Sequence, residues 1–405
     1  MAAKLRILHV IPSLSASEGG PTSALIAMVT ALAQTGVSVT VATTGAGTPR
    51  SFSENDRSAN IAYLTFARTT LFYKTSWSLT WWLRKHVSDF DCVHIHALFS
   101  YSSVIAAVFA RKRRVPYIVR PLGVLNRWGV RNRRQWLKRL SIQLLESRIL
   151  RGATVIHYTT TRERTEAREA HRTIGERDSV VLPIPLLAPE SVDSENSEDF
   201  AQSHQELKGY RIVLFLGRLD PIKGLDLLLP AFAEARAAFP HWLLVIAGTG
   251  DEAFVRSLQK RAEELRLGSE ALMWTGHLNT TAKTAALSAA DVFVLPSYSE
   301  SFGIAAAEAL ASGVATILSS NCGLAEDVSD AGAGIVFECS VPALTAALKR
   351  VFEDDQFRDQ LAQRGQEFAT RFSMEEFGTA CVQLYRTALR DANHRRANKW
   401  VNGRR

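Results

Sequence analysis

Short apolar runs alternate along most of the chain with longer segments of helical periodicity. The runs have the length of strands and are rich in valine, isoleucine and leucine, which is typical of buried parallel strands. Strands are predicted at 5–11, 37–42, 61–66, 92–96, 117–120 and 154–157 in the first half, and at 211–216, 242–247, 272–274, 292–295, 315–318 and 335–337 in the second. This alternation favours an α/β fold with two doubly wound, mostly parallel sheets.

Composition divides the chain into two domains. Residues 188–209 are rich in Glu, Ser, Asp and Gln and poor in large apolar side chains. We therefore interpret them as a linker between a first domain at 1–187 and a second at 210–372.

The last segment, 373–405, opens with the capping box Ser373-Met374-Glu375-Glu376, which predicts a helix. One face of this helix carries Phe377, Cys381, Leu384 and Ala388. The basic residues after 391 are expected to fray.

Length and composition are those of a globular protein. The 405 residues are enough for two ordinary domains, and 46% are apolar and 22% charged. The four cysteines show no metal spacing, so reduced thiols in a cytoplasmic protein are expected. No apolar run is long enough to span a bilayer, so any membrane contact is expected to be peripheral, at the inner face.

The net charge of +8 conceals an asymmetry. Residues 1–187 contain 26 Lys/Arg and 11 Asp/Glu, whereas the rest of the chain contains 22 and 29. The basic charge is concentrated at 111–151, with 13 Lys/Arg, a single acid and the interleaved Trp128 and Trp136. Such a stretch fits anionic lipid or, equally well, a solvated basic face over one apolar stripe. Nucleic acid ranks last, because no recognised binding module accompanies it.

Two glutamates eight positions apart flank the start of a predicted helix. An apolar strand ends at Pro296, and the alanine-rich segment 302–311 follows Glu300. The helix N-terminus at Phe302, Gly303 and Ile304 offers unpaired N–H groups to an anion. Glu308 would lie up to ~12 Å from Glu300 and ~80° around the helix. The two acids would therefore meet opposite ends of one elongated ligand; the alternative is two solvated glutamates.

This stretch resembles the Glu-x7-Glu signature of retaining family-4 glycosyltransferases, which have the two-domain GT-B architecture. The resemblance extends to Gly217-Arg218-Leu219-Asp220-Pro221-Ile222-Lys223-Gly224, Ala247-Gly248-Thr249-Gly250, the glycine turn Gly19-Gly20 and the loop at 321–326. It implies two Rossmann-like domains facing a cleft, with the last helix crossing back to the first domain.

The resemblance also implies roles for single residues. Arg218 and Lys223 would bind the donor diphosphate, Glu300 the sugar hydroxyls and Glu308 the ribose. Gly248 and His277 lie on loops that meet the donor, although His277 is equally plausible as a turn residue. Gly19 and Gly20 would approach the phosphates from the first domain.

The first domain contains one further candidate site. His94 and His96 lie on one face at the carboxyl end of a predicted strand, and His96, nearer the end, is expected to reach a cleft. One strand later, Arg120-Pro121-Leu122-Gly123-Val124-Leu125 has no histidine where many family members have one. Asp89-Phe90-Asp91 precedes a strand, so we interpret it as a solvated turn and predict no metal.

The predicted activity is transfer of a sugar from a nucleotide diphosphate sugar to a glycan or lipid-diphosphate-linked acceptor in polysaccharide synthesis. No metal, cofactor or dedicated protein base is expected. A nucleotide-sugar epimerase and a non-catalytic scaffold at the membrane are the alternatives.

Overall fold

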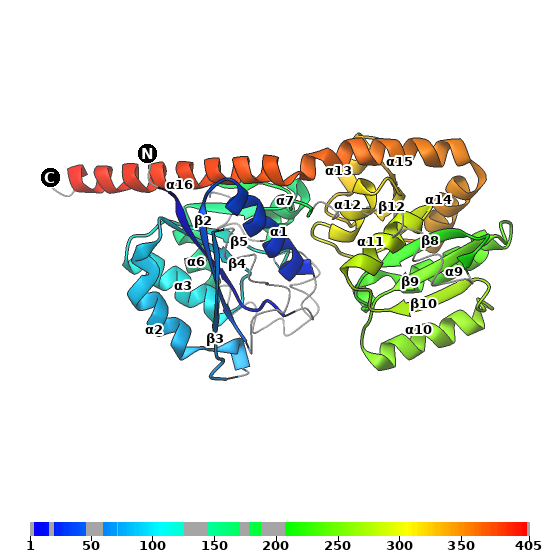
Figure 1. Ribbon diagram of the computed structural model, residues 1–405, viewed down its shortest axis with the longest axis horizontal. Helices are drawn as coiled ribbons and strands as arrows, with labels where there is room; N and C mark the ends of the chain where they lie inside the picture. The colour runs from blue at the N-terminus through cyan, green and yellow to red at the C-terminus, as the bar shows by residue number, and fades with distance from the viewer. Residues whose placement is uncertain are drawn as a thin grey trace. The chain divides into compact units, whose positions relative to one another are not determined.

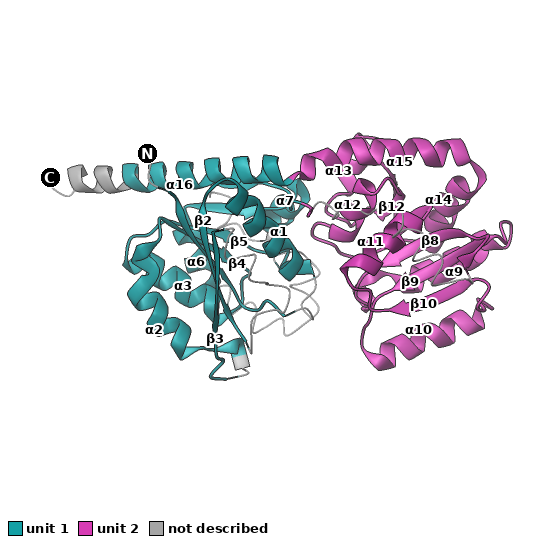
Figure 2. Cartoon of the chain, in the orientation of Figure 1, with its two compact units in different colours: residues 1–185, 374–405 teal, residues 186–373 magenta. Residues whose placement is uncertain are grey.

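The computed structural model describes residues 4–15, 20–45, 60–70, 72–124, 145–170, 178–187 and 207–402. The chain forms two compact units, shown in teal and magenta in Figure 2. Unit 1 is Met1–Pro185 together with Met374–Arg405, and unit 2 is Leu186–Ser373. Residues 188–206 of the predicted linker lie outside the described residues.

Unit 1 is built on a seven-stranded parallel sheet with the order β3-β2-β1-β4-β5-β6-β7 (Figure 1). Its strands are β1 (Arg6–Ile11), β2 (Ser38–Thr44), β3 (Ile61–Phe66), β4 (Cys92–His96), β5 (Tyr117–Arg120), β6 (Val155–Tyr158) and β7 (Ser179–Val181). The six strands predicted from the sequence are all present within two residues, and β7 was missed.

The helices of unit 1 cover both faces of this sheet. They are α1 (Gly20–Gln34), α2 (Trp77–His86), α3 (Tyr101–Lys112), α6 (Ser147–Gly152), α7 (Thr161–Ala170) and α16 (Met374–Asn402), with 3₁₀ turns η3 (Phe72–Lys74) and η4 (Val87–Asp89). Residues of α2, α3 and α6 pack against Leu8, Val93 and Val119 on one face. Residues of α1 and α16 pack against Ile7 and Ile118 on the other.

Helix α16 returns the end of the chain to unit 1, as the family resemblance implies. Phe377, Cys381, Leu384 and Ala388, the predicted apolar face, are all buried together with Tyr385 in this core. Gly378 lets the helix approach α1 closely, because a Cβ there would lie 2.8 Å from the Ala31 carbonyl oxygen. Beyond 391, where fraying is expected, the backbone is helical to Asn402.

Unit 2 repeats the architecture with a six-stranded parallel sheet of order β10-β9-β8-β11-β12-β13. Its strands are β8 (Arg211–Leu216), β9 (Trp242–Ala247), β10 (Leu272–Gly276), β11 (Val292–Leu295), β12 (Ala315–Ser319) and β13 (Ile335–Phe337). Its helices are α9 (Leu225–Arg236), α10 (Glu252–Glu264), α11 (Thr280–Ala289), α12 (Ile304–Ala311), α13 (Ala325–Asp330), α14 (Val341–Glu353) and α15 (Asp355–Ala369), with η8 (Pro221–Lys223) and η9 (Thr370–Phe372). All six predicted strands are present.

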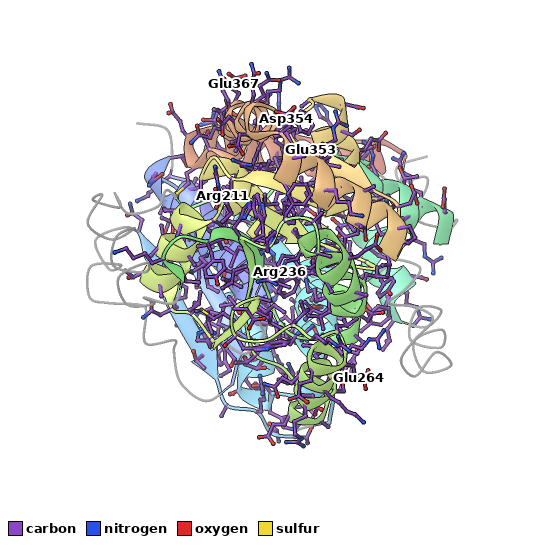
Figure 3. The ribbon with its side chains drawn as sticks, turned by 90° about the vertical axis from the view of Figure 1, so that its right-hand side faces the viewer. Arg211, Arg236, Glu264, Glu353, Asp354 and Glu367 are labelled. Atoms are coloured by element: carbon purple, nitrogen blue, oxygen red, sulfur yellow. The ribbon has the colours of Figure 1, made fainter. Side chains whose placement is uncertain are left out.

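Two arginines tie the amino ends of the unit 2 strands to their neighbours (Figure 3). Arg211 at the start of β8 donates to Asp291 at 2.8 Å and Asp355 at 3.2 Å. Arg236 at the end of α9 donates to the carbonyl oxygens of Trp242 at 3.0 Å and Glu270 at 2.9 Å. These bonds fix one end of the sheet, and the opposite, carboxyl end carries the predicted site residues.

Each sheet has a topological switch point, where the strand order reverses. In unit 1 it lies between β1 and β4, and in unit 2 between β8 and β11. Open α/β sheets bind ligands beyond the carboxyl ends of the strands at such points. None of the described helices combines the length and the hydropathy needed to cross a bilayer.

Candidate functional site

The loops after β8 and β11 touch at the switch point of unit 2. Gly224, at φ 71°, ends η8 in the left-handed region. A Cβ there would overlap the Pro296 carbonyl oxygen, so only glycine lets the two loops come this close. The Tyr298 N–H then donates to the Ile222 carbonyl oxygen at 2.8 Å. As a result, Lys223 on one loop and Glu300 on the other lie side by side.

Lys223 and Glu300 form a partly buried ion pair. Lys223 Nζ lies 2.5 Å from Glu300 Oε2, and the side chains are 18% and 21% exposed. A third loop fixes the Glu300 backbone, because its N–H donates to Asn321 at 3.2 Å and its carbonyl oxygen accepts from Gly323 at 2.7 Å. The loop at 321–326 therefore positions the Glu300 backbone.

Helix α12 begins directly after Gly303, at φ 98°. A Cβ at this position would lie 2.9 Å from Cys322 Sγ, so glycine is required by both conformation and space. The Phe302 ring is buried and packs edge-to-face on Phe372, with ring centroids 5.5 Å apart. The first N–H groups of the helix, beginning at Ile304, have no intrahelical acceptor and favour a negative ligand.

Glu308 lies one turn further along α12 and pairs with a lysine from another helix. Lys283 Nζ on α11 lies 2.6 Å from Glu308 Oε1, with side chains 28% and 23% exposed. Both predicted acids are thus held by a lysine from a neighbouring element. Nothing in the local sequence around Lys283 signals this contact.

Arg218 is an exposed residue of the predicted site. Its side chain is 65% exposed, and its guanidinium lies 4.0 Å from Asp220. Asp220 also caps η8 by accepting from the Ile222 N–H at 3.1 Å. Arg218 is therefore oriented by a neighbour but remains accessible to a solvent-borne anion.

Gly248 and His277 lie on the loops after β9 and β10. Gly248 has φ 150°, and its N–H donates to the Gly276 carbonyl oxygen at 2.7 Å. A Cβ at Gly248 would overlap the Gly217 carbonyl oxygen, so three consecutive strand ends meet backbone to backbone. His277 follows Gly276 and is exposed.

The expectation that His96 reaches a cleft was wrong. Alternation does bring His94 and His96 to one face of β4, with ring centroids 4.5 Å apart. Both side chains, however, are fully buried. The reason is that α1 and α16 cover this face. The Tyr385 hydroxyl of α16 forms hydrogen bonds with both His94 and His9.

The two aspartates of Asp89-Phe90-Asp91 make local contacts. Asp89 pairs with His86 at 3.0 Å, and Asp91 accepts from the Arg6 N–H at 2.8 Å. Gly20 is the first residue of α1, whereas Gly19 lies outside the described residues. Trp128, Trp136 and most of the basic stretch also lie outside them.

Unit 1 also contains a buried carboxylate that the sequence pattern does not predict as functional. Glu163 of α7 accepts from the Gly123 N–H at 2.7 Å and from the N–H and hydroxyl of Thr159, both at 2.8 Å. It thereby fixes the loop after β5, where Gly123 has φ 70°.

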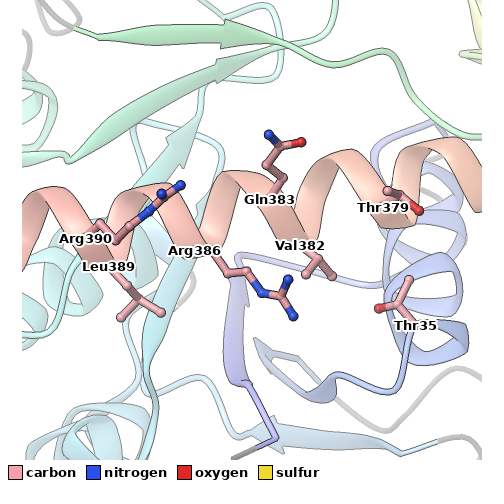
Figure 4. A pocket seen from close by; sticks show the side chains of 7 residues that line it. All are labelled: Thr35, Thr379, Val382, Gln383, Arg386, Leu389 and Arg390. Carbon is pink, nitrogen blue, oxygen red and sulfur yellow. The ribbon is translucent and has the colours of Figure 1, made fainter. Parts of the chain in front are cut away.

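An open groove runs along α16 beside the end of α1 (Figure 4). Arg386, Arg390 and Thr35 line it, and no carboxylate does. It lies away from the strand ends and shares no residue with the predicted site.

Comparisons with known proteins match both units to glycosyltransferase families. The family described as "Glycosyl transferase 4-like domain" matches residues 19–185, and "Glycosyl transferases group 1" matches residues 196–368. The chain belongs to the family-4 glycosyltransferases of GT-B architecture.

Curated relatives of this family match part of the chain. The phosphatidyl-myo-inositol mannosyltransferase of Mycolicibacterium smegmatis is 32% identical over 213 residues, 50% of this chain and 54% of that protein. The D-inositol 3-phosphate glycosyltransferase of a Nocardioides species is 35% identical over 191 residues, 44% of this chain and 42% of that protein. The match thus spans about half the length of these relatives.

Solved structures share the fold over nearly the whole chain. Sucrose-phosphate synthase from Thermosynechococcus elongatus has a TM-score of 0.77 at 22% identity and covers 95% of this chain and 99% of its own. HepE from Anabaena, solved with UDP-glucose, has a TM-score of 0.77 at 17% identity, covering 95% and 100%.

Proposed function

We propose that this family-4 glycosyltransferase moves a sugar, with retention of configuration, from a nucleotide diphosphate sugar to a glycan or lipid-linked acceptor. The observation that carries the proposal is the arrangement of Glu300 and Glu308. Each is held by a lysine at the carboxyl edge of unit 2, and the N-terminus of α12 lies between them. A sugar, a diphosphate and a ribose are the groups that suit these three positions.

The diphosphate carries most of the chemistry in this proposal. Negative charge develops on it as the bond to the sugar breaks, and prearranged donors stabilise that charge. Lys223, Arg218 and the first N–H groups of α12 are the donors available, and the glycine at 303 keeps side chains away from them. A donor phosphate oxygen takes the proton of the acceptor hydroxyl, and neither a metal ion nor another cofactor takes part.

The acceptor belongs to the synthesis of a cell-surface polysaccharide in our proposal, and the reaction takes place at the cytoplasmic face of the membrane. The surface of α2 supports peripheral contact with anionic lipid. Trp77 and Trp81 are 61% and 57% exposed and lie four positions apart on the helix. Arg84 stacks over the Trp81 ring at 5.2 Å, and Arg113 donates to the Arg84 carbonyl oxygen. Exposed tryptophan flanked by basic residues suits a lipid headgroup region.

A thermal-shift screen of the full chain against UDP, GDP, ADP and their common sugars tests the donor. A ligand that binds only the folded state raises Tm by mass action. One nucleotide should raise Tm, the shift should survive EDTA, and Glu308→Ala should reduce it. If no nucleotide shifts the folded protein, the scaffold alternative replaces the transferase.

Product analysis separates the transferase from the epimerase. Incubation with the donor alone should release no epimerised nucleotide sugar. Appearance of such a product without any acceptor would assign the chain to the epimerases of the same architecture.

A further inference from the structure

A connected seam of polar side chains runs through the core of unit 1. It contains four histidines, Tyr385 of α16 and Arg120 at the end of β5, and all six are at most 1% exposed. In the sheet register His9 pairs with His94, and His96 pairs with Arg120, so these side chains project from the same face. Neither the proposed donor site nor the predicted roles account for this seam.

One hydrogen bond fixes the direction of the whole seam. His157 Nε2 lies 3.0 Å from the Leu182 carbonyl oxygen, which can only accept, so His157 carries its proton on Nε2. The histidines are neutral, because burial and positive neighbours lower their pKa values, to about 3 for His157. A neutral imidazole has a single N–H, so His157 Nδ1 is an acceptor.

The proton position on His157 determines donor and acceptor at each further hydrogen bond. His94 Nε2 donates to His157 Nδ1 at 3.4 Å, and Tyr385 donates its hydroxyl proton to His94 Nδ1 at 2.8 Å. The Tyr385 oxygen then accepts from His9 Nε2 at 3.3 Å. His96 Nε2 donates to His9 Nδ1 at 2.9 Å. All four imidazoles therefore carry the proton on Nε2, and the chain ends at the bare Nδ1 of His96.

That last nitrogen is buried and has no partner among the described residues. An unpaired buried acceptor costs about 1–3 kcal/mol. A donor from outside the chain would remove this cost.

Arg120, the register partner of His96, is a buried hydrogen-bond donor that lacks a strong acceptor. Its Nη1 contacts the Met28 thioether at 3.1 Å, a weak acceptor, and its Nε has no partner. Within the described residues no carboxylate forms an ion pair with it. Burial lowers the Arg120 pKa only to about 10, so the guanidinium stays charged at neutral pH. The Glu163 carboxylate favours this charge from a distance, but a buried cation without an ion-pair partner among the described residues is a costly arrangement for a purely structural residue.

We propose that Arg120 and His96 form a subsite for a phosphate monoester that carries one proton. The phosphate oxyanion accepts from the Arg120 guanidinium, and its P–O–H group donates to the bare Nδ1 of His96. Both residues end their strands at the carboxyl edge, beside the switch point, where open α/β sheets bind ligands. Tyr385 is a positioning residue, because it transmits the proton order from Leu182 to His9 and His96.

The seam favours an anion over a metal ion. His9, His94 and His96 offer nitrogen atoms within 4.8 Å of one another, which is a possible metal-ligand set. Those nitrogens already bond to each other and to Tyr385. The adjacent charge of Arg120, which also lowers the pKa of His96, repels a divalent cation.

As the acceptor subsite of a transferase, this proposal rests on the proposed function, so the test measures binding alone. The full chain is titrated with methyl phosphate and, as a matched diester without the P–O–H group, dimethyl phosphate. If the nucleotide screen finds that UDP binds, the titration is done at a saturating UDP concentration. If UDP does not bind, the titration is done without it. Because both side chains are covered, binding is measured at equilibrium by calorimetry.

Methyl phosphate should bind at least about 10-fold more tightly than dimethyl phosphate at pH 6. Its affinity should fall at pH 8, where the monoester has lost its second proton. Arg120→Met should abolish binding without lowering Tm, because a volume-matched apolar side chain replaces a buried cation that forms no ion pair within the described residues. His96→Phe should reduce methyl phosphate to the affinity of the diester.

Arg386→Met, which removes an exposed arginine from the groove of Figure 4, is the control and should bind normally. Loss of binding in this variant instead would overturn the subsite and assign the anion to the groove. Equal affinity for monoester and diester, or a marked fall in Tm in Arg120→Met, would also overturn it.

Imidazole ¹⁵N spectra test the proton order independently. All four histidines of the seam should show the Nε2–H tautomer, and Tyr385→Phe should free only His9 and His96 to change tautomer. An Nδ1–H tautomer of His96 in the wild type, or loss of the Nε2–H signals on adding Zn²⁺, would contradict the subsite.

Discussion

Lys223 and Glu300 are 77 positions apart in sequence, and their charged groups meet at 2.5 Å. The contact joins the loops after the two strands that form the switch point of unit 2. It holds the lysine beside the N-terminus of α12, where a diphosphate would meet both. The pair therefore prearranges a cation at the position where the proposed reaction develops negative charge.

Lys223→Ala should lower kcat by about 100- to 1,000-fold, as expected when one prearranged donor to an oxyanion is lost. Its effect on nucleotide Kd should be smaller, because the lysine acts most strongly in the transition state. Steady-state kinetics with the donor found in the screen measure both.

The matched control for this prediction is Lys349→Ala. Lys349 pairs with Glu234 at 3.1 Å on an exposed surface of the same unit, so its loss should leave kcat unchanged. Wild-type turnover in Lys223→Ala would remove this lysine from the proposed mechanism.

Glu308→Gln should weaken nucleotide binding by about 10-fold, since the carboxylate accepts from ribose hydroxyls in the proposed complex. Removal of the ribose hydroxyls from the ligand serves as the second mutation of a double-mutant cycle. The wild type should prefer the nucleotide over its 2′,3′-dideoxy analogue, and Glu308→Gln should bind the two alike. Calorimetry with both ligands checks this.

Lys283→Met should show the same loss of discrimination in a weaker form, because Lys283 orients Glu308 without touching the ribose. If Glu308→Gln retains the full preference for the ribose hydroxyls, the assignment of that residue is wrong.

Gly248→Ala should destabilise unit 2 by more than about 2 kcal/mol. The new Cβ would overlap the Gly217 carbonyl oxygen, and φ 150° is unfavourable for any other residue. Urea unfolding monitored by tryptophan fluorescence gives the change.

Gly209→Ala separates the cost of a positive φ from the cost of a steric overlap at the added Cβ. Gly209 also has a positive φ, 88°, but nothing lies within 4 Å of its Cβ position. It should therefore cost only about 1 kcal/mol. Equal costs at the two glycines would mean that the loops after β8 and β9 do not touch.

The strands could be predicted because each is an apolar run with a turn signal behind it. β7 was missed because Ser179–Val181 offers only two apolar residues. Contacts between elements that are distant in sequence could not be predicted from it. The burial of His96 depends on α16, whose Tyr385 lies 291 positions after its partner His94. Lys283 and Glu163 were missed for the same reason, since each partners a residue from another loop or helix.

The histidine seam should make the protein unusually sensitive to acid. Burial, together with the charge of Arg120 and neighbouring histidines, lowers the pKa values of His9 and His157 to about 3, and those of His94 and His96 well below normal. In the unfolded chain each would titrate near ~6.5. The unfolded state therefore binds more protons as pH falls. Stability is complete above pH ~6.5 and is lost as pH falls toward 3, by up to about 1.4 kcal/mol per pH unit for each histidine.

Four ionisable groups that face the seam keep the same protonation state in this window. Burial raises the pKa of Tyr385 and of Cys92, and raises that of Cys381 to about 12, while Arg120 stays protonated below about 10. The slope of unfolding free energy against pH should therefore be determined by protonation of the four seam histidines.

Urea unfolding at intervals between pH 7 and 5 measures that slope. His157→Gln should reduce it by about one proton, because the amide can still donate to Leu182 without titrating. His241→Gln, at an exposed histidine before β9, should leave it unchanged. A slope near zero in the wild type would mean that the four imidazoles accept protons in the folded state, and that their hydrogen-bond order does not hold at neutral pH.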